Sequence, residues 1–368
     1  MHLSRRDVLS ASALLLAGPG FAMRAAGREA VAKGLSDPII LCWNENPYGP
    51  SPAARAAVSE AIPAGCRYPD DEMDELTTLI ASREGVAPDC IVSGTGSGEL
   101  LRALGLLAAR GGGEIVAAQP TYTELTRYAE ACGAHITFVP VDKSLRHDLA
   151  AMHAAINART RAVYLCNPNN PTGTTVAAAD IRAFVAALPP EVTTIVDEAY
   201  LDFVVAPEVT SVVDLTAGTQ RVVVLRTFSK IHGMAGIRCG YGIARADVAK
   251  ELAAARMTTP NVFAVRAARA SLGDKAFLAD TRRRILASRV RLTTELARLK
   301  LAYAEPQGNF VFFDTGMPLK RFTELMRARN ILVGRRFAPF ENWCRITVGT
   351  EREVQAFLDA LPEVTKRA

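Results

Sequence analysis

The most informative stretch of this chain is Thr227-Phe228-Ser229-Lys230-Ile231-His232-Gly233-Met234-Ala235-Gly236-Ile237-Arg238. It follows an apolar run, Val222 to Leu225, that predicts a buried strand. A lysine forms an imine with an aldehyde only as the neutral amine, which burial or nearby positive charge favours. Lys230 is accompanied by three side chains that can donate hydrogen bonds to a phosphate, namely Thr227, Ser229 and Arg238. The stretch therefore indicates a Schiff-base lysine beside a phosphate site.

Two further polar groups follow apolar runs. Asp197 closes the run Thr193 to Val196, and a carboxylate buried at a strand end needs a partner. A protonated pyridine nitrogen would be such a partner, and an aspartate there keeps the ring an electron sink. The rigid turn Asn167-Pro168-Asn169-Asn170-Pro171-Thr172-Gly173 follows the run Ala162 to Cys166. Within it, Asn170 could donate a hydrogen bond to a phenolic oxygen.

A glycine-rich turn adds a second phosphate-binding element. Gly94-Thr95-Gly96-Ser97-Gly98-Glu99 follows Ile91-Val92 and precedes a helical pattern from Leu100 to Ala109. Such a turn exposes backbone N–H groups at the positive end of a helix, where phosphates bind. Pro120-Thr121-Tyr122 follows the apolar run Glu114 to Ala118 and offers an aromatic face for stacking.

Taken in this order, the motifs resemble the pyridoxal-phosphate (PLP)-dependent aminotransferases of fold type I, class I/II, and most closely the histidinol-phosphate aminotransferase family. The resemblance runs from about Leu41 to about Leu361. It includes Asn44-Glu45-Asn46-Pro47-Tyr48-Gly49-Pro50 and the pair Tyr68-Pro69. It implies an α/β fold with a mainly parallel central sheet and a smaller α/β domain. It also implies PLP as cofactor and amino-group transfer between an amino acid and a 2-keto acid.

The resemblance also implies a role for each matching residue. Lys230 would form the Schiff base and move the Cα proton, with Asp197 and Tyr200 completing the catalytic set. The residues implied to bind the cofactor are Thr95, Gly96, Ser97, Tyr122, Asn170, Asp197, Tyr200, Thr227, Ser229, Lys230 and Arg238, together with Tyr68 from a neighbouring subunit. The active unit would therefore be a homodimer. Arg345 would grip the substrate α-carboxylate, and Asn309 and Asn46 would also lie at the substrate.

The chain departs from the family pattern at two positions. The family usually has an arginine where Gly334 stands, and that arginine helps to bind the substrate phosphate; here Arg335 and Arg336 follow instead. Gly98 stands where an acidic residue is common. Histidinol phosphate is therefore open as the substrate. Two alternatives also stay open, a PLP-dependent decarboxylase, lyase or oxidase and a non-catalytic protein that binds the cofactor or an amino acid.

The amino terminus carries a separate pattern. Ser4-Arg5-Arg6-Asp7-Val8-Leu9 is followed by an apolar stretch that reaches Ala17. This resembles a twin-arginine export signal, and the stretch is shorter than the roughly 20 residues that span a bilayer. Because that route carries folded proteins, it suits an enzyme that folds around a cofactor. The pattern predicts a periplasmic protein; a disordered or tag-like start is the alternative.

Composition agrees with a soluble enzyme of about two domains. The 368 residues are 49% hydrophobic, and the net charge of +5 is not gathered in a basic block that would indicate nucleic acid. No stable membrane association is expected. The seven cysteines lack metal-ligand spacing and are interpreted as buried thiols, with no metal site.

The chain is expected to divide into four parts. These are the export signal (1–26), the arm with part of the small domain (27–65), the large PLP-binding domain (66–274), and the connecting helix with the small domain (275–368).

Overall fold

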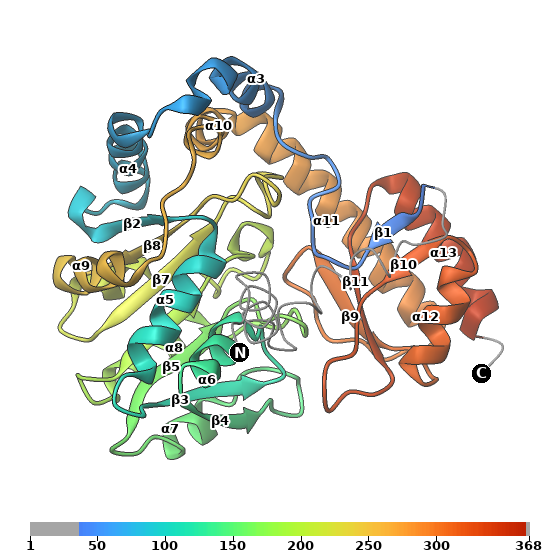
Figure 1. Ribbon diagram of the computed structural model, residues 1–368. Helices are drawn as coiled ribbons and strands as arrows, with labels where there is room; N and C mark the ends of the chain where they lie inside the picture. The colour runs from blue at the N-terminus through green and yellow to red at the C-terminus, as the bar shows by residue number, and fades with distance from the viewer. Residues whose placement is uncertain (1–36, 366–368) are drawn as a thin grey trace, which may run out of the picture.

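The computed structural model describes residues 37–365 of the chain (Figure 1). The predicted export signal, residues 1–26, lies outside the described residues. The large domain is built on a seven-stranded sheet of order β2-β8-β7-β6-β5-β3-β4. Its strands are β2 (Ile91–Gly94), β3 (Glu114–Gln119), β4 (His135–Pro140), β5 (Thr160–Cys166), β6 (Thr193–Asp197), β7 (Val222–Thr227) and β8 (Gly240–Ala244). All neighbours are parallel except β8, which is antiparallel to both β2 and β7.

Helices cover both faces of this sheet, which explains why its strands are almost continuously apolar. Along β5, Val163 and Leu165 belong to one buried cluster, while Tyr164 and Cys166 belong to another on the opposite face. The helices of the large domain are α4 (Asp70–Glu84), α5 (Ser97–Ala109), α6 (Glu124–Ala131), α7 (Leu149–Ala154), α8 (Ala178–Ala186), α9 (Ala246–Ala255) and α10 (Val262–Gly273). Because β3 to β7 run parallel to one another, their carboxyl ends lie at the same edge of the sheet.

The small domain follows a long helix, α11 (Lys275–Arg298), which Asp274 caps by accepting a hydrogen bond from the Phe277 N–H at 3.3 Å. Its other elements are β9 (Phe310–Asp314), α12 (Leu319–Arg327), β10 (Ile331–Val333), β11 (Trp343–Thr347) and α13 (Glu351–Thr365). β9 and β11 pair antiparallel. Their buried side chains pack with those of the flanking helices into a core separate from the large sheet.

The amino-terminal arm divides between the two domains. β1 (Ile39–Leu41) pairs in parallel with β10 of the small domain. α3 (Pro52–Ala61), capped by Ser51, packs instead against α10 (Figure 1). The connection between β1 and α3 therefore crosses from one domain to the other, past the carboxyl edge of the large sheet.

The interpretation of the cysteines as buried thiols is wrong for three of the seven. Cys66 and Cys132 are exposed and Cys90 is half-buried, whereas the other four are buried. Cys66 ends a short 3₁₀ turn and Cys132 ends α6, and their apolar neighbours did not reveal which side faces solvent. All seven thiols, which lie within the described residues, are free. Between residues 37 and 365, no helix combines the length and the apolar character that crossing a bilayer requires.

Candidate active site

Lys230 lies three residues beyond the end of β7, at the carboxyl edge of the large sheet. Its Nζ donates to the main-chain oxygen of Asn44 at 2.9 Å and lies 3.5 Å from that of Trp43. Burial, together with the positive charge of Arg345, lowers the pKa of Lys230 to about 8 from its ordinary value of 10.5. A large share of the amine is therefore neutral near pH 8, as a nucleophile requires.

Asp197 ends β6, the neighbouring strand, and its carboxylate is buried. One oxygen accepts from the Ala199 N–H at 3.1 Å and the other from the Tyr164 hydroxyl at 3.2 Å. Burial raises the pKa of Asp197 to about 6, although these hydrogen bonds and the Lys230 charge oppose the rise. A cationic partner would stabilise this carboxylate, so the position fits a protonated pyridine nitrogen. Sequence reasoning assigned no role to Tyr164.

The Tyr200 hydroxyl contacts two side-chain amides at the carboxyl edge of the large sheet. The oxygen accepts from Asn170 Nδ2 at 3.3 Å and from Asn44 Nδ2 at 3.1 Å. The structure thus brings the predicted Asn170 and Tyr200 together and adds Asn44, which had no assigned role. Asn44 is buried with φ at +54°, a left-handed conformation in which asparagine is enriched, but only the fold reveals this.

The predicted phosphate-binding residues converge at the amino terminus of α5. Gly96 has φ at +87°, and a Cβ there would collide with the guanidinium of Arg238. That guanidinium lies 3.4 Å from Ser229 Oγ and donates to the Thr95 main-chain oxygen at 3.2 Å. Thr227 Oγ1 donates to Ser229 Oγ at 2.9 Å. The donors surround the start of a helix whose positive end favours a phosphate, with Ser97 as its first residue.

Glu99 stabilises the turn that carries the predicted phosphate-binding residues, a role that sequence reasoning missed. One carboxylate oxygen accepts from the Thr95 N–H at 2.7 Å and from its hydroxyl at 3.1 Å. The other accepts from the N–H groups of Met257 and Thr258, each at 2.9 Å. Glu99 therefore fixes the glycine-rich turn to the segment that joins α9 to α10.

The two predicted tyrosines are placed differently. Tyr122 follows β3 and packs, half-buried, against the cluster on the α5 face of the sheet. Tyr68 is 90% exposed, so a single chain does not bury it among the other site residues. Its predicted contact requires a second subunit and stays a prediction.

Arg345, on β11, forms the small-domain side of the site. Its guanidinium is buried and donates to Asn170 Oδ1 and to the Cys42 main-chain oxygen, both at 2.6 Å. Its Nε has no hydrogen-bond partner, and among residues 37–365 no carboxylate forms an ion pair with it. Burial lowers the pKa of Arg345, and the positive charge of Arg335 contributes to this. A buried cation without a counter-ion is expensive, so the position is suited to an anionic ligand.

Both predicted substrate asparagines make hydrogen bonds that involve the arm: Asn309 binds to it, and Asn46 is part of it. Asn309 Nδ2 donates to the main-chain oxygens of Asn44 and Glu45, at 3.2 and 3.4 Å, while its Oδ1 is buried without a partner. Asn46 Nδ2 donates to the Ile231 oxygen at 2.8 Å, and Asn46 Oδ1 accepts from the Tyr48 N–H at 3.0 Å. Asn46 therefore links the arm to the Lys230 loop, and Asn309 keeps one acceptor available.

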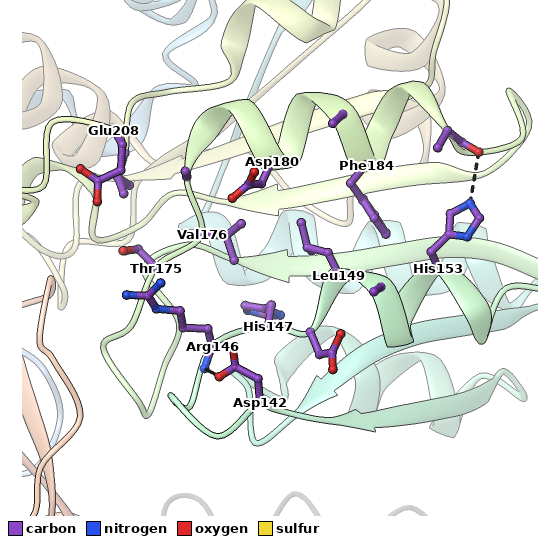
Figure 2. Close-up of a pocket in the computed structure, with 16 residues that line it drawn as sticks. Asp142, Arg146, His147, Leu149, His153, Thr175, Val176, Asp180, Phe184 and Glu208 are labelled. Carbon is purple, nitrogen blue, oxygen red and sulfur yellow. Dashed lines mark hydrogen bonds between the residues drawn. The ribbon is translucent and has the colours of Figure 1, made fainter.

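A cavity of about 670 Å³ lies elsewhere, between α7 and α8 (Figure 2). His147, Leu149 and Phe184 are among its lining residues, and no predicted site residue is. This cavity is therefore separate from the cluster of predicted site residues at the strand ends.

Comparison with known proteins identifies the family. The family model described as aminotransferase class I and II matches residues 36–361. The chain belongs to the class I and II aminotransferases. The histidinol-phosphate aminotransferase of Moorella thermoacetica is 38% identical over 334 residues, which cover 90% of this chain and 86% of that relative. The histidinol-phosphate aminotransferase of Brevibacillus brevis is 36% identical over 338 residues, covering 91% and 92%.

A solved structure supports the same assignment for this aminotransferase. The histidinol-phosphate aminotransferase from Sinorhizobium meliloti, in complex with pyridoxal-5'-phosphate, matches with a TM-score of 0.84 and 28% identity, covering 100% of this chain and 99% of that one. The predicted fold type I architecture and the PLP cofactor are confirmed. The protein is a PLP-dependent transaminase that moves an amino group between an amino acid and a 2-keto acid, and the alternative PLP reactions are not favoured.

The lowered pKa of Lys230 predicts how the aminotransferase takes up its cofactor. The rate at which cofactor-free protein forms the Schiff base with PLP should rise with pH, with a midpoint near 8, because only the neutral amine attacks the aldehyde. Stopped-flow absorbance would measure this rate between pH 6 and 10, a range that extends about two pH units on each side of the expected midpoint. A midpoint near the ordinary value for lysine would contradict the prediction.

Proposed function

We propose that this aminotransferase takes amino donors with an anionic group beside Cα, either a carboxylate bonded directly to Cα or a phosphate linked to it through CH2–O, with histidinol phosphate as the phosphate-bearing donor and a 2-keto acid as acceptor. The observation that carries the proposal is Arg345, a buried guanidinium that lacks a carboxylate partner and keeps Nε available. A phosphate monoester or a carboxylate would satisfy it through charge-assisted hydrogen bonds. The names of the relatives support histidinol phosphate as the donor.

The side chains divide the work of the reaction. When bound, PLP supplies an aldehyde that links to amines and a ring that withdraws electrons from the substrate Cα. Lys230 Nζ would take the proton from Cα and deliver it to the cofactor carbon that carried the aldehyde, because its lowered pKa lets it act as both base and acid near neutral pH. The carboxylate of Asp197 holds a proton on the ring nitrogen. Arg345 orients the donor, so that the Cα–H bond faces Lys230.

Arg335 is the residue that would distinguish a phosphate from a carboxylate. Its guanidinium lies over the Phe337 ring at 5.0 Å, and that of Arg345 lies over the same ring at 5.1 Å. Arg336, next in the chain, pairs instead with Glu341 at 3.1 Å on the exposed surface. A phosphate dianion carries more charge than a carboxylate and would recruit both Arg345 and Arg335.

We therefore expect Arg335→Ala to lower kcat/KM for histidinol phosphate about 10- to 100-fold, and that for glutamate much less, because one charge-assisted contact of about 1.5–3 kcal/mol is lost. Arg336→Ala is the matched control and should behave like the wild type. The measurement is the single-turnover loss of the PLP absorption band with histidinol phosphate, histidinol and glutamate. If histidinol reacts as fast as histidinol phosphate, the proposed anion recognition is wrong.

We also propose that the active unit is a homodimer in which Tyr68 serves the partner's cofactor. The 90% exposure of Tyr68 supports this, because a large aromatic side chain at the surface is available to a second copy. Mixing Tyr68→Ala with Lys230→Ala protomers tests it. A hybrid dimer would contain one intact site, so activity should appear on mixing two inactive proteins; additive residual activities would argue against sharing.

A third proposal concerns location. We propose that the protein is exported folded, on the basis of Arg5-Arg6 and the apolar stretch that follows. Replacing both arginines with lysine in the full chain should leave the enzyme in the cytoplasm, whereas the unchanged chain should be recovered from the periplasm. Equal periplasmic recovery of the two would contradict the twin-arginine route.

A further inference from the structure

Leu145 stands out in the loop between β4 and α7 because its backbone is left-handed, with φ at +61°. A leucine rarely adopts this conformation, which therefore has to be imposed by the surroundings. Asp142 imposes it: its Oδ1 accepts from the N–H groups of Ser144 at 2.8 Å and Arg146 at 2.9 Å, and its main-chain oxygen accepts from the Leu145 N–H at 2.9 Å. The loop is thus a closed turn with a leucine at its tip.

The side chain of Leu145 crosses from the large domain to the small one. It packs against the buried side chains of Ala304, Phe312 and Phe337, as Phe340 and Trp343 also do, and we call these last five residues the aromatic cluster. Within this cluster the rings of Phe312 and Trp343 lie 4.9 Å apart, and those of Phe312 and Phe337 meet edge to face at 6.1 Å. Leu145 is the large-domain residue in this group.

The aromatic cluster also supports the arginines of the substrate site. The Arg345 guanidinium lies over the Phe337 ring at 5.1 Å, and Arg335 lies over the same ring at 5.0 Å. A change in how Phe337 packs would therefore shift both cations. Leu145 packs against the cluster that contains this ring.

The main chain of Leu145 leads to the same arginine by another route. Its oxygen accepts from Thr174 Oγ1 at 2.6 Å, and that hydroxyl is 2.8 Å from Thr172 Oγ1. Thr172 in turn accepts from Asn169 Nδ2 at 3.0 Å. The next residue, Asn170, accepts from Arg345. The loop is thus connected to Arg345 through the aromatic cluster of the small domain and through the asparagine turn of the large domain.

We propose that Leu145 is a positioning residue for substrate binding, a latch between the domains that keeps Arg345 and Arg335 where the donor's anion must bind. The proposal rests on the anion recognition proposed above. Beside the latch lies a cavity of about 470 Å³, lined by Leu145, Thr174, Gln307 and Trp343, so the domains are not packed continuously here. Leu145 is therefore a contact between the domains at the edge of this cavity, in addition to the hydrogen bonds that Gln307 makes to Val205 and Gly173.

The test is Leu145→Gly in the PLP-loaded full chain. Glycine accepts the left-handed backbone, so the substitution removes the side chain without adding strain. We expect KM for histidinol phosphate and for glutamate to rise about tenfold, with kcat within about threefold and the PLP absorption band unchanged. Leu145→Met, which keeps an apolar side chain, should restore most of the affinity.

Lys300→Gly is the matched control, because Lys300 also has a positive φ, +58°, but is outside the aromatic cluster. It should leave KM unchanged. Phe340→Ala should raise KM as Leu145→Gly does, and the double variant should be less than additive. An unchanged KM in Leu145→Gly, or full additivity with Phe340→Ala, would overturn the latch. The proposed function would fail separately, if the wild type did not discriminate histidinol phosphate from histidinol.

Discussion

Replacing Lys230 with alanine is expected to reduce turnover by at least about 10⁴-fold, because one side chain supplies both the covalent link and the proton transfer. The amine is held at 2.9 Å from the Asn44 oxygen and is kept largely neutral near pH 8. No other lysine is available to replace it: among the described residues, only Lys230 occupies the strand-end site. Steady-state transamination and the visible absorption band of PLP measure the two losses.

Two further variants test whether imine formation, rather than positive charge, is what Lys230 contributes. Lys230→Arg keeps a cation but cannot form an imine, so it should be as inactive as the alanine variant and should also lack the imine band. Lys250→Ala, on the exposed side of α9, is the matched control and should retain wild-type activity. Turnover within tenfold of wild type in either Lys230 variant would refute the assignment of this residue.

Arg226→Ala is expected to destabilise the fold by about 3–5 kcal/mol, because it leaves buried carboxylates without their cation. Arg226 Nε lies 2.9 Å from a carboxylate oxygen of Glu198, and Arg226 Nη2 lies 3.6 Å from one of Glu84. Glu84 also accepts from the Tyr241 hydroxyl at 2.6 Å. For a chain of this length, the loss corresponds to a fall in Tm of roughly 4–6 °C. Calorimetry of the cofactor-free protein measures it.

The control for this second prediction is Arg182→Ala. Arg182 pairs with Asp214 at 2.8 Å, but both side chains are well exposed, so the loss should be below about 1 kcal/mol. The double variant Arg226→Met, Glu198→Gln should recover part of the stability, since it removes a buried charge together with its partner. Equal Tm values for Arg226→Ala and Arg182→Ala would show that the buried network contributes little.

Much of the site was predictable because parallel strands gather their carboxyl ends. Lys230, Asp197 and Asn170 are far apart in the sequence, but each follows an apolar run that the structure places at one sheet edge. The turn before α5 was predictable for a local reason, since its glycines permit the backbone that a phosphate needs. These signals require no knowledge of distant contacts.

Contacts between segments distant in the chain were not predictable. Asn44 reaches Thr347 across 303 positions, and no local pattern indicates that its amide meets Tyr200. The same holds for Leu145, whose neighbours in the aromatic cluster come from residues beyond 300. The shift of the arginines past Gly334 was visible in the sequence. Only the fold shows that Arg335 and Arg345 lie over the same ring, that of Phe337, and that Arg336 pairs with Glu341 at the surface.

Lys230 and Arg345 each donate to a main-chain oxygen of the arm, that of Asn44 and that of Cys42 respectively. Peptide carbonyls are present whatever side chain a residue carries, so mutation at these positions leaves the anchoring atoms in place. Trp43, between them, is 36% exposed. Exchange of that side chain would therefore leave in place the main-chain oxygens that position the reactive amine and the buried cation.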